Sequence, residues 1–229
     1  MEPDATSTDT LREKLLDAAL AHVPFDGWSR SAFRAAALES GIGTEEAWRV
    51  CTRGPLDLAA AHHRRGDRIM RDAIAAEDLS GMRIRDRVTH AVRTRIETDS
   101  DREIVRRSSA LFALPSNSAV GARLIWDTSD AIWIALGDTS DDINWYTKRM
   151  ILSGVHSATV LYWLGDGSAG SQDTWAFLDR RVAEVMEFER FKGRLRESPM
   201  TKGAVAAAEA MFSKVRAPSR TKRRDLPGR

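Results

Sequence analysis

The chain has 229 residues, of which 42% are hydrophobic and 30% are charged, so it can bury a core beneath a charged surface. This balance excludes a wholly disordered chain, a collagen-like repeat and a small disulfide scaffold. The 35 basic and 33 acidic residues nearly cancel, but residues 190–229 hold twelve basic and three acidic ones, which leaves a charge of −7 on the preceding 189. A basic tail on an acidic body is typical of proteins that meet phosphate on lipid or nucleic acid.

Apolar residues recur at spacings of three and four along most of the chain, and no long segment alternates strictly between apolar and polar residues. The sequence therefore predicts an all-α fold. Residues 1–9 are predicted to be disordered, a capping box of Thr10 and Glu13 begins the first helix, and Pro24 ends it. Further helices are expected at residues 29–40, from 44, from 55, and at 82–97, 101–113, 117–136, 142–164, 173–195 and 201–216.

Side chains that could perform catalysis or bind metal do not converge in the sequence. His62 and His63 are adjacent, so they point in different directions on a helix. Cys51 is the single cysteine, which excludes an intrachain disulfide. Residues 165–170 match the dinucleotide fingerprint Gly-x-Gly-x-x-Gly, but they lie between helices and are interpreted as a helix–helix connection. We expect a binding protein with no catalytic residue, no metal and no cofactor, and rank an unrecognised enzyme last.

The predicted helices 117–136 and 142–164 are the first indication of what the chain binds. They contain six of the nine Trp and Tyr residues. Such a pair either forms plain core or leaves a pocket for an apolar ligand. With a pocket, Arg149 would neutralise a phosphate or carboxylate at its mouth. The candidate lipid-binding residues are Arg149, Trp126, Trp133, Leu152, Val155 and Thr159.

The C-terminal segment is the second indication. Residues 200–216 form an amphipathic pattern, and the basic residues 217–229 are predicted to be a disordered tail. This pattern is typical of a helix that lies on a membrane surface, or of a helix docked on its own domain, and both interpretations stay open. The candidate membrane-contacting residues are Met211, Phe212, Lys214, Val215 and Arg216.

The longest uncharged stretch, residues 150–165, falls short of the roughly 20 apolar residues that a spanning helix needs. The first ten residues have neither the basic nor the apolar region of a signal peptide. We therefore expect a soluble, intracellular protein that can still lie on a membrane.

Residues 10–58 resemble the helix-turn-helix end of TetR-type regulators, and residues 32–42 are similar to the second helix and turn of that family. Glu45 and Glu46 stand where a DNA-reading helix would approach phosphates, whereas DNA readers place basic and polar side chains there. The resemblance implies a helix-turn-helix-like three-helix unit at 10–55 and a helical bundle with an apolar pocket at 56–196. Because of the two glutamates, we expect the fold without nucleic-acid binding.

A closer resemblance covers about residues 11–195. It is carried by AAHHRRGDRIM (60–70), MRIRDRV (82–88), NWYTKR (144–149) and DTWAFLDRRV (173–182). These phrases resemble the lipid-binding accessory family of ubiquinone biosynthesis, the ninth member of the Coq series in its bacterial form. The last two phrases are the most specific, and they occur in the family's order.

This resemblance implies a dimeric, non-enzymatic, TetR-like protein that holds a phospholipid or an isoprenoid quinone intermediate. It also implies a partner, the demethoxyubiquinone hydroxylase, and a peripheral position on the inner face of a bacterial cell membrane through the C-terminal helix. The alternative is a TetR-type transcriptional regulator with a small-molecule pocket. The resemblance places Arg149 near the lipid head group, and the residues expected on the partner surface are Asn144, Trp145, Tyr146 and Lys148.

Overall fold

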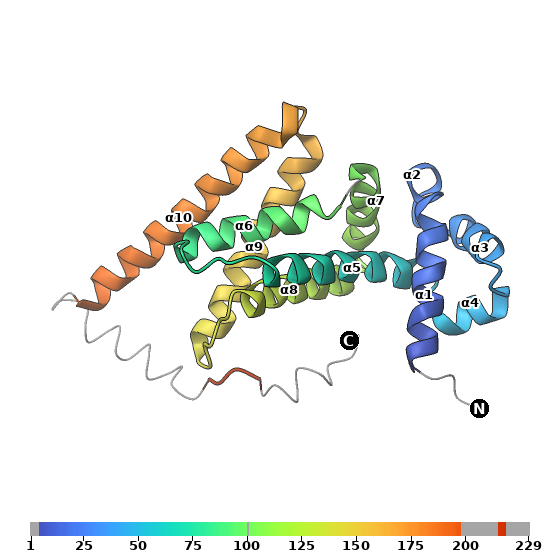
Figure 1. The fold of residues 1–229 in the computed structure, drawn as a ribbon, viewed down its shortest axis with the longest axis horizontal. Coiled ribbons are helices and arrows are strands. Elements are labelled where there is room, and N and C mark those ends of the chain that lie inside the picture. The colour runs from blue at the N-terminus through green and yellow to red at the C-terminus, as the bar shows by residue number, and fades with distance from the viewer. Residues whose placement is uncertain (1–4, 100, 198–214, 219–229) are drawn as a thin grey trace. The chain divides into compact units, whose positions relative to one another are not determined.

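The computed structural model describes residues 5–99, 101–197 and 215–218, and within these ranges the chain forms helices and no strand (Figure 1). The predicted all-α fold is confirmed. In chain order the elements are α1 (Ala5–Leu20), α2 (Val23–Asp26), α3 (Arg30–Glu39), α4 (Thr44–Val50), α5 (Pro55–Ala75), α6 (Ile84–Glu97), α7 (Arg102–Ala113), α8 (Ser118–Ala135), α9 (Ile143–Gly165), the 3-10 turn η1 (Ala169–Ser171) and α10 (Gln172–Glu197).

Most predicted helices lie where the sequence places them, and the main differences are at the two ends of the chain. α1 begins at Ala5, so residues 5–9 are helical rather than disordered and Thr10 lies inside the helix instead of capping it. Pro24 does not end α1 but occupies the first turn of the short α2, where its missing N–H is tolerated. Of the helix expected at 201–216, residues 201–214 lie outside the described ranges. Val215 and Arg216 are described and are not helical.

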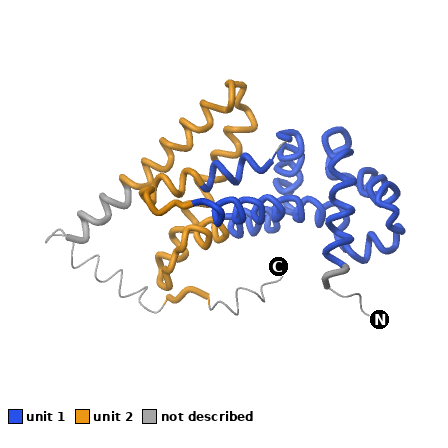
Figure 2. Tube along the Cα trace, viewed as in Figure 1, with its two compact units in different colours: residues 1–77, 91–128 blue, residues 78–90, 129–229 orange. Residues whose placement is uncertain are grey.

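The chain divides into two compact units (Figure 2). Unit 1 comprises residues 1–77 and 91–128, and unit 2 comprises residues 78–90 and 129–229. α6 and α8 each begin in one unit and end in the other. The boundary predicted between residues 55 and 56 does not coincide with this division, because α5 belongs to unit 1.

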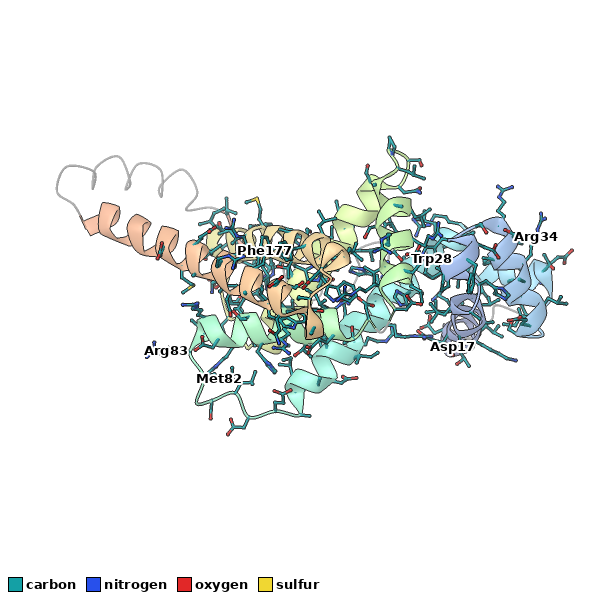
Figure 3. All side chains as sticks on the ribbon, turned by 90° about the horizontal axis from the view of Figure 1, so that it is seen from above. Asp17, Trp28, Arg34, Met82, Arg83 and Phe177 are labelled. Atoms are coloured by element: carbon teal, nitrogen blue, oxygen red, sulfur yellow. The ribbon has the colours of Figure 1, made fainter. Side chains whose placement is uncertain are left out.

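Unit 1 is held by an apolar core in which α1 packs against α3, α4 and α5. Leu15, Leu16 and Phe33 are fully buried there. Trp28, labelled in Figure 3, is also buried, and its indole N–H donates a hydrogen bond of 2.8 Å to the hydroxyl of Ser108 on α7. The polar edge of this ring is therefore satisfied inside the core, as burial of a tryptophan requires.

The ends of α3 follow from its sequence. The Ser29 hydroxyl accepts a hydrogen bond of 3.1 Å from the Ala32 N–H and caps the helix start. Gly41 adopts a φ of +68°, a conformation that favours glycine, and this lets the Ile42 N–H reach the Ala37 carbonyl. The predicted C-terminal cap at Gly41 is confirmed.

A buried ion network joins α5 to α6 within unit 1. The Arg95 guanidinium, 2% exposed as a residue, donates to Asp67 Oδ1 at 2.7 Å, to Asp99 Oδ2 at 2.8 Å and to the His63 carbonyl at 3.0 Å. It lies against Gly66, where an added Cβ would come within 2.6 Å of its central carbon. A buried guanidinium needs hydrogen-bonded carboxylates of this kind, because without them nothing offsets the free-energy cost of removing its charge from water.

In unit 2, α9 and α10 form a helical hairpin (Figure 1). The connection begins at Asp166, whose carboxylate accepts hydrogen bonds from the Ser168 N–H at 2.7 Å and from the Thr174 N–H and hydroxyl at 3.0 and 2.5 Å. Farther along the hairpin, the ring of Phe177, labelled in Figure 3, stacks on Tyr162 with centroids 4.6 Å apart. The glycine-rich residues 165–170 are thus a helix–helix connection, as predicted.

Candidate functional site

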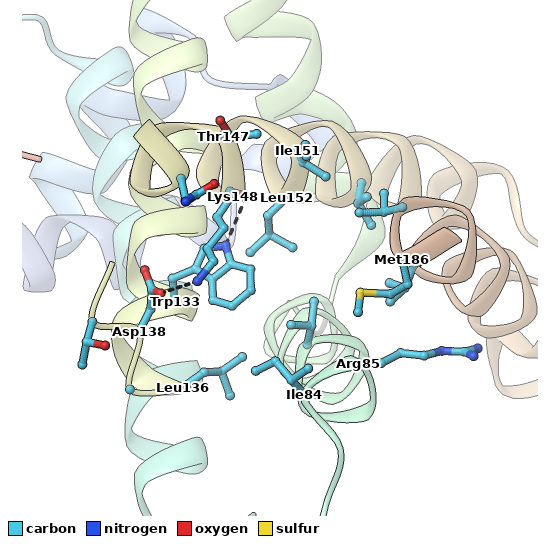
Figure 4. Close-up of a pocket in the computed structure, with 17 residues that line it drawn as sticks. Ile84, Arg85, Trp133, Leu136, Asp138, Thr147, Lys148, Ile151, Leu152 and Met186 are labelled. Atoms are coloured by element: carbon cyan, nitrogen blue, oxygen red, sulfur yellow. Dashed lines mark hydrogen bonds and ion pairs between the residues drawn. The ribbon is translucent and has the colours of Figure 1, made fainter. Parts of the chain in front are cut away.

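Unit 2 contains a cavity of about 440 Å³. Its walls come from the start of α6, the end of α8, the α8–α9 loop, α9 and α10, and all of these stretches belong to unit 2. Figure 4 shows the side chains that surround it. Small-molecule sites typically have volumes of about 300 to 1,000 Å³, so this cavity has the size of a ligand pocket.

Most of the pocket wall is apolar. Ten of its 17 lining residues carry aliphatic, aromatic or thioether side chains, and they come from four helices and the turn after α8. A wall of this kind binds a hydrocarbon group well and gives a soluble polar ligand few partners. The apolar lining residues are Ile84, Val88, Trp133, Leu136, Ile151, Leu152, Val155, Val182, Val185 and Met186.

The pocket also has a polar end, formed by the α8–α9 loop and the first turns of α9. Lys148 is its cation, and its ammonium group donates 2.8 Å hydrogen bonds to Asp138 Oδ1 and the Ser140 hydroxyl. The same nitrogen lies 5.2 Å from the centre of the Trp133 ring, whose indole N–H donates to the Lys148 carbonyl (Figure 4). The other polar side chains of this end are Thr139, Asn144 and Thr147, while Arg85 lines the pocket from α6.

Arg149 does not lie at the pocket mouth, where the sequence placed it. It is fully buried, its Nε donates to Asp130 Oδ1 at 2.7 Å, and its Nη1 donates to Asp138 Oδ2 at 3.1 Å and to the Trp145 carbonyl at 3.0 Å. The guanidinium also stacks on the Trp145 ring at 4.1 Å. The head-group role predicted for Arg149 is therefore wrong, because its charge is already neutralised inside the protein. The neighbouring Lys148 is the cation at the polar end of the pocket.

Asp138 connects the two cations. Burial by itself would raise the pKa of this carboxyl group. Hydrogen bonds from Lys148, Ser140 and Arg149 outweigh burial and hold the pKa at about 2. Asp138 therefore stays ionised at neutral pH and fixes the position of Lys148.

The other predicted lipid-binding residues divide between the pocket and its surroundings. Trp133, Leu152 and Val155 line the cavity. Thr159 does not line it, and its buried hydroxyl donates to the Val155 carbonyl one turn earlier in α9. Trp126 does not line it either and belongs to unit 1.

The predicted partner surface is only partly exposed. Trp145 is 4% exposed, and its ring lies between the Arg149 guanidinium and an edge-on contact with Tyr146 at 4.7 Å. It is therefore not an exposed anchor, since an aromatic stacked on a buried cation has no free face to offer. Asn144 is exposed, whereas Tyr146 and Lys148 are half-buried.

The residues that sequence reasoning missed are mainly the acids that complete this network, Asp130 and Asp138, together with the lining residues of α6 and α10. One signal for the acids exists in the sequence. Arg149 and Asp130 are charged residues inside the two most apolar helices, and buried charges are normally paired. For the contribution of α6 the sequence offers no comparable signal.

Other classes of site are not seen in the described part of the chain. No group of three or more His, Cys, Asp or Glu residues there is arranged to hold a metal ion. Among the same residues, no helix combines the length and the apolar character needed to cross a membrane. On α4, Glu45 and Glu46 are exposed in the first turn.

The fold is all-α and TetR-like, and its second unit contains a largely apolar cavity. A solved structure, described as the TetR transcriptional regulator from Nitrosomonas europaea ATCC 19718, superposes with a TM-score of 0.62 and covers 77% of this chain and 98% of its own. The sequence identity is 17%, so this likeness shows the fold alone.

The COQ9 family model matches residues 118–189, the stretch that runs from α8 into α10. The mitochondrial ubiquinone biosynthesis protein COQ9 of Rattus norvegicus is 27% identical over 81% of this chain and 62% of its own length, and that of Homo sapiens is 28% identical over 81% and 60%. The protein of the same name from Drosophila melanogaster is 30% identical over 82% of this chain and 60% of its own. The resemblance is therefore confirmed, and the chain is a relative of the COQ9 proteins. It spans about 60% of the length of the curated relatives it matches.

Proposed function

We propose that this protein is a non-enzymatic, lipid-binding accessory protein of ubiquinone biosynthesis. It holds an isoprenoid quinone intermediate in the pocket of unit 2 and presents it to the demethoxyubiquinone hydroxylase. The observation that carries the proposal is the two-part pocket, which has an apolar wall from four helices and one polar end around Lys148. The COQ9 match at residues 118–189 covers every part of this pocket except the three lining residues of α6.

The chemistry of the pocket suits a small polar ring with an apolar tail. The ring would meet the Lys148 ammonium group, the Trp133 face and the exposed Asn144 amide, all of which lie at the polar end. The tail would lie along the aliphatic wall formed by α9 and α10. Because Lys148 is already paired with Asp138, this end offers hydrogen bonds without a strong net charge, as a neutral quinone or phenol requires.

The size of the pocket limits how much ligand it can enclose. A volume of about 440 Å³ lies toward the lower end of the range of roughly 300 to 1,000 Å³ found for small-molecule sites. A substituted ring and a short length of isoprenoid tail occupy such a space, while a complete long-chain lipid does not. The remainder of the tail would extend outside the pocket, which is compatible with a ligand shared with a membrane or a partner protein.

Partners enter the proposal through exposed groups. Asn144 is exposed although it also lines the polar end, and it is retained as a partner-facing residue together with the half-buried Tyr146. Met150 on α9 and Ile134 on α8 are 62% and 47% exposed. Exposed apolar side chains of this kind support association with a second copy of the chain. Membrane contact through residues 201–214 also stays part of the proposal, although those residues lie outside the described ranges.

The alternative, a TetR-type transcriptional regulator, is less well supported. The fold alone does not imply DNA binding. A DNA-reading helix meets phosphate oxygens, and the exposed Glu45 and Glu46 of α4 would repel them. Salt-dependent, sequence-selective binding of DNA would favour this alternative over the proposal.

A pocket-filling substitution tests the proposed function. Val155→Trp places an indole ring in the cavity, and Leu161→Trp places the same ring on the exposed side of the same helix. We expect wild type and Leu161→Trp to bind a ubiquinone with two isoprene units, measured by calorimetry, and Val155→Trp to lose at least tenfold in affinity, or roughly 1.4 kcal/mol. Equal affinity of both variants, with unchanged thermal midpoints, would contradict binding in this pocket.

A further inference from the structure

A short segment near the end of the chain, Val215–Pro218, lies against the start of α9 (Figure 1). The Ala217 N–H donates a hydrogen bond of 2.8 Å to the Asp141 carbonyl. The Tyr146 hydroxyl donates one of 3.3 Å to the Arg216 carbonyl. Both polar atoms of one peptide unit, that between residues 216 and 217, are thus bonded to the body of unit 2.

The surroundings of this segment are consistent with a specific contact. Val215, Ala217 and Pro218 are half-buried, while the Arg216 side chain is exposed. Arg216 is thereby held through its backbone, and its charge is left in solvent. The loop that receives the segment carries Asp141 and Asp142 in addition to the already paired Asp138, and the chain around the segment is basic. Opposite charge therefore favours the contact in addition to the two hydrogen bonds.

The contact falls on the loop that builds the polar end of the pocket. Gly137, Asp138 and Thr139 of this loop line the cavity, and Ser140 accepts a hydrogen bond from Lys148. Asp141, the next residue, is the one that accepts the hydrogen bond from Ala217. A contact that holds Asp141 in place therefore also restrains the neighbouring residues that form the polar end of the pocket.

We propose that Val215–Pro218 is an intramolecular strap that holds the α8–α9 loop closed and so controls how fast a ligand exchanges with the pocket. The strap does not touch the ligand site, because none of its four residues lines the cavity. It acts by keeping the loop in one position, and its release allows the loop to move. This inference rests on the proposed function only in that the pocket must bind an apolar ligand.

Hydrogen exchange tests whether the strap is docked in solution. Tyr146→Phe removes the hydroxyl that bonds Arg216, and Tyr162→Phe is the matched control, because Tyr162 is the other tyrosine of α9 and stacks on Phe177. We expect the Ala217 amide to be protected in wild type and in the control, and to exchange roughly fivefold faster in Tyr146→Phe, the effect of losing one hydrogen bond of ordinary net strength. An unprotected Ala217 amide in wild type, or equal exchange in both variants, would overturn the strap.

Ligand kinetics test what the strap controls. The probe is 1-N-phenylnaphthylamine, an apolar dye that fluoresces on transfer from water, mixed with the full chain in a stopped-flow instrument. We expect Tyr146→Phe to raise the association and dissociation rates by the same factor, roughly fivefold, and to leave Kd unchanged. A change in only one of the two rates, and therefore in Kd, would point to an ordinary structural role for Tyr146 and overturn the inference.

The two proposals fail in different ways. If the dye does not bind to any variant, the proposed pocket function and the control of exchange are both contradicted, while the exchange of the Ala217 amide still decides whether the strap docks. If the dye binds and Val155→Trp abolishes binding, but Tyr146→Phe leaves both rates unchanged, the pocket is supported and the strap has no role in exchange.

Discussion

Replacing Asp138 by asparagine removes the one carboxylate that holds both Lys148 and Arg149. The asparagine has nearly the same shape, so the main change is electrostatic. Lys148 keeps Ser140 and partial contact with solvent, and Arg149 keeps Asp130. The variant is therefore expected to fold, at a measurable cost in stability.

The size of this cost follows from the pKa of Asp138. Its ordinary value of 3.8 is lowered to about 2, and its side chain is 3% exposed, so little of the effect is screened by solvent. At about 1.4 kcal/mol for each tenfold change in acid dissociation, the native interactions of the ionised carboxylate contribute on the order of 2 kcal/mol to the free energy of unfolding. We expect Asp138→Asn to lose about this amount near neutral pH.

The pH dependence makes the prediction specific. A carboxyl group whose pKa is lowered on folding stabilises the protein fully above its ordinary pKa of 3.8, and this stabilisation is lost as the pH falls toward 2. The difference between wild type and Asp138→Asn should therefore be constant from pH 7 to about pH 5 and shrink between about pH 4 and pH 2. Urea unfolding followed by circular dichroism measures it. Asp141→Asn, at an exposed position of the same loop, is the control and should stay within about 0.5 kcal/mol of wild type. Asp138→Asn with wild-type stability at pH 7, or with the same loss of stability at pH 7 and pH 3, would contradict a stabilising role of the ionised Asp138 carboxylate.

Three further predictions concern other parts of the chain. Gly66→Ala should destabilise unit 1 by roughly 1 to 3 kcal/mol, because the added Cβ would lie 2.6 Å from the buried Arg95 guanidinium. Gly81→Ala is the control: Gly81 has open space around it, and its substitution should change the free energy of unfolding by less than about 0.5 kcal/mol. Trp145→Ala should reduce the free energy of unfolding by roughly 3 to 5 kcal/mol, and so lower the thermal midpoint, because the ring is buried. A stable variant that lost only partner binding would instead support Trp145 as an exposed anchor. Cys51 should react slowly with a thiol reagent at pH 8 until urea unfolds the protein, since burial raises the pKa of the Cys51 thiol to about 11. Rapid modification of the folded chain would contradict the buried position.

The helices could be predicted well from the sequence because their signals are local. Apolar spacing, the Ser29 and Gly41 ends of α3 and the glycine-rich break after α9 each depend on a few neighbouring residues. The start of α1 was placed incorrectly for the same reason. The Thr10 and Glu13 pair is a sound local capping signal, but the helix continues upstream of it to Ala5.

The site was harder to predict, since it depends on which side of each helix faces inward and which charges meet there. Lys148 and Arg149 are adjacent and chemically similar, yet α9 turns one toward the pocket and the other toward Asp130. Sequence reasoning placed Arg149 near the lipid head group and Lys148 on the partner surface, whereas Lys148 lines the pocket and Arg149 is fully buried. The residues around Arg149 do not indicate that two distant acids will both reach its guanidinium. Asp130 lies nineteen positions earlier, in α8, and Asp138 lies in the loop between α8 and α9. The apolar lining of α9 was predictable, because Leu152 and Val155 follow from helical spacing alone.

If the pocket of unit 2 holds an isoprenoid quinone intermediate, this lipid should copurify with the protein. Mass spectrometry of the organic extract of protein purified from a ubiquinone-producing cell tests it most directly. We expect an isoprenoid quinone or its phenolic precursor in near-stoichiometric amount in wild type and in Leu161→Trp, and its loss from folded Val155→Trp. The same lipid in equal amount in Val155→Trp, or phospholipid alone in all three proteins, would contradict it.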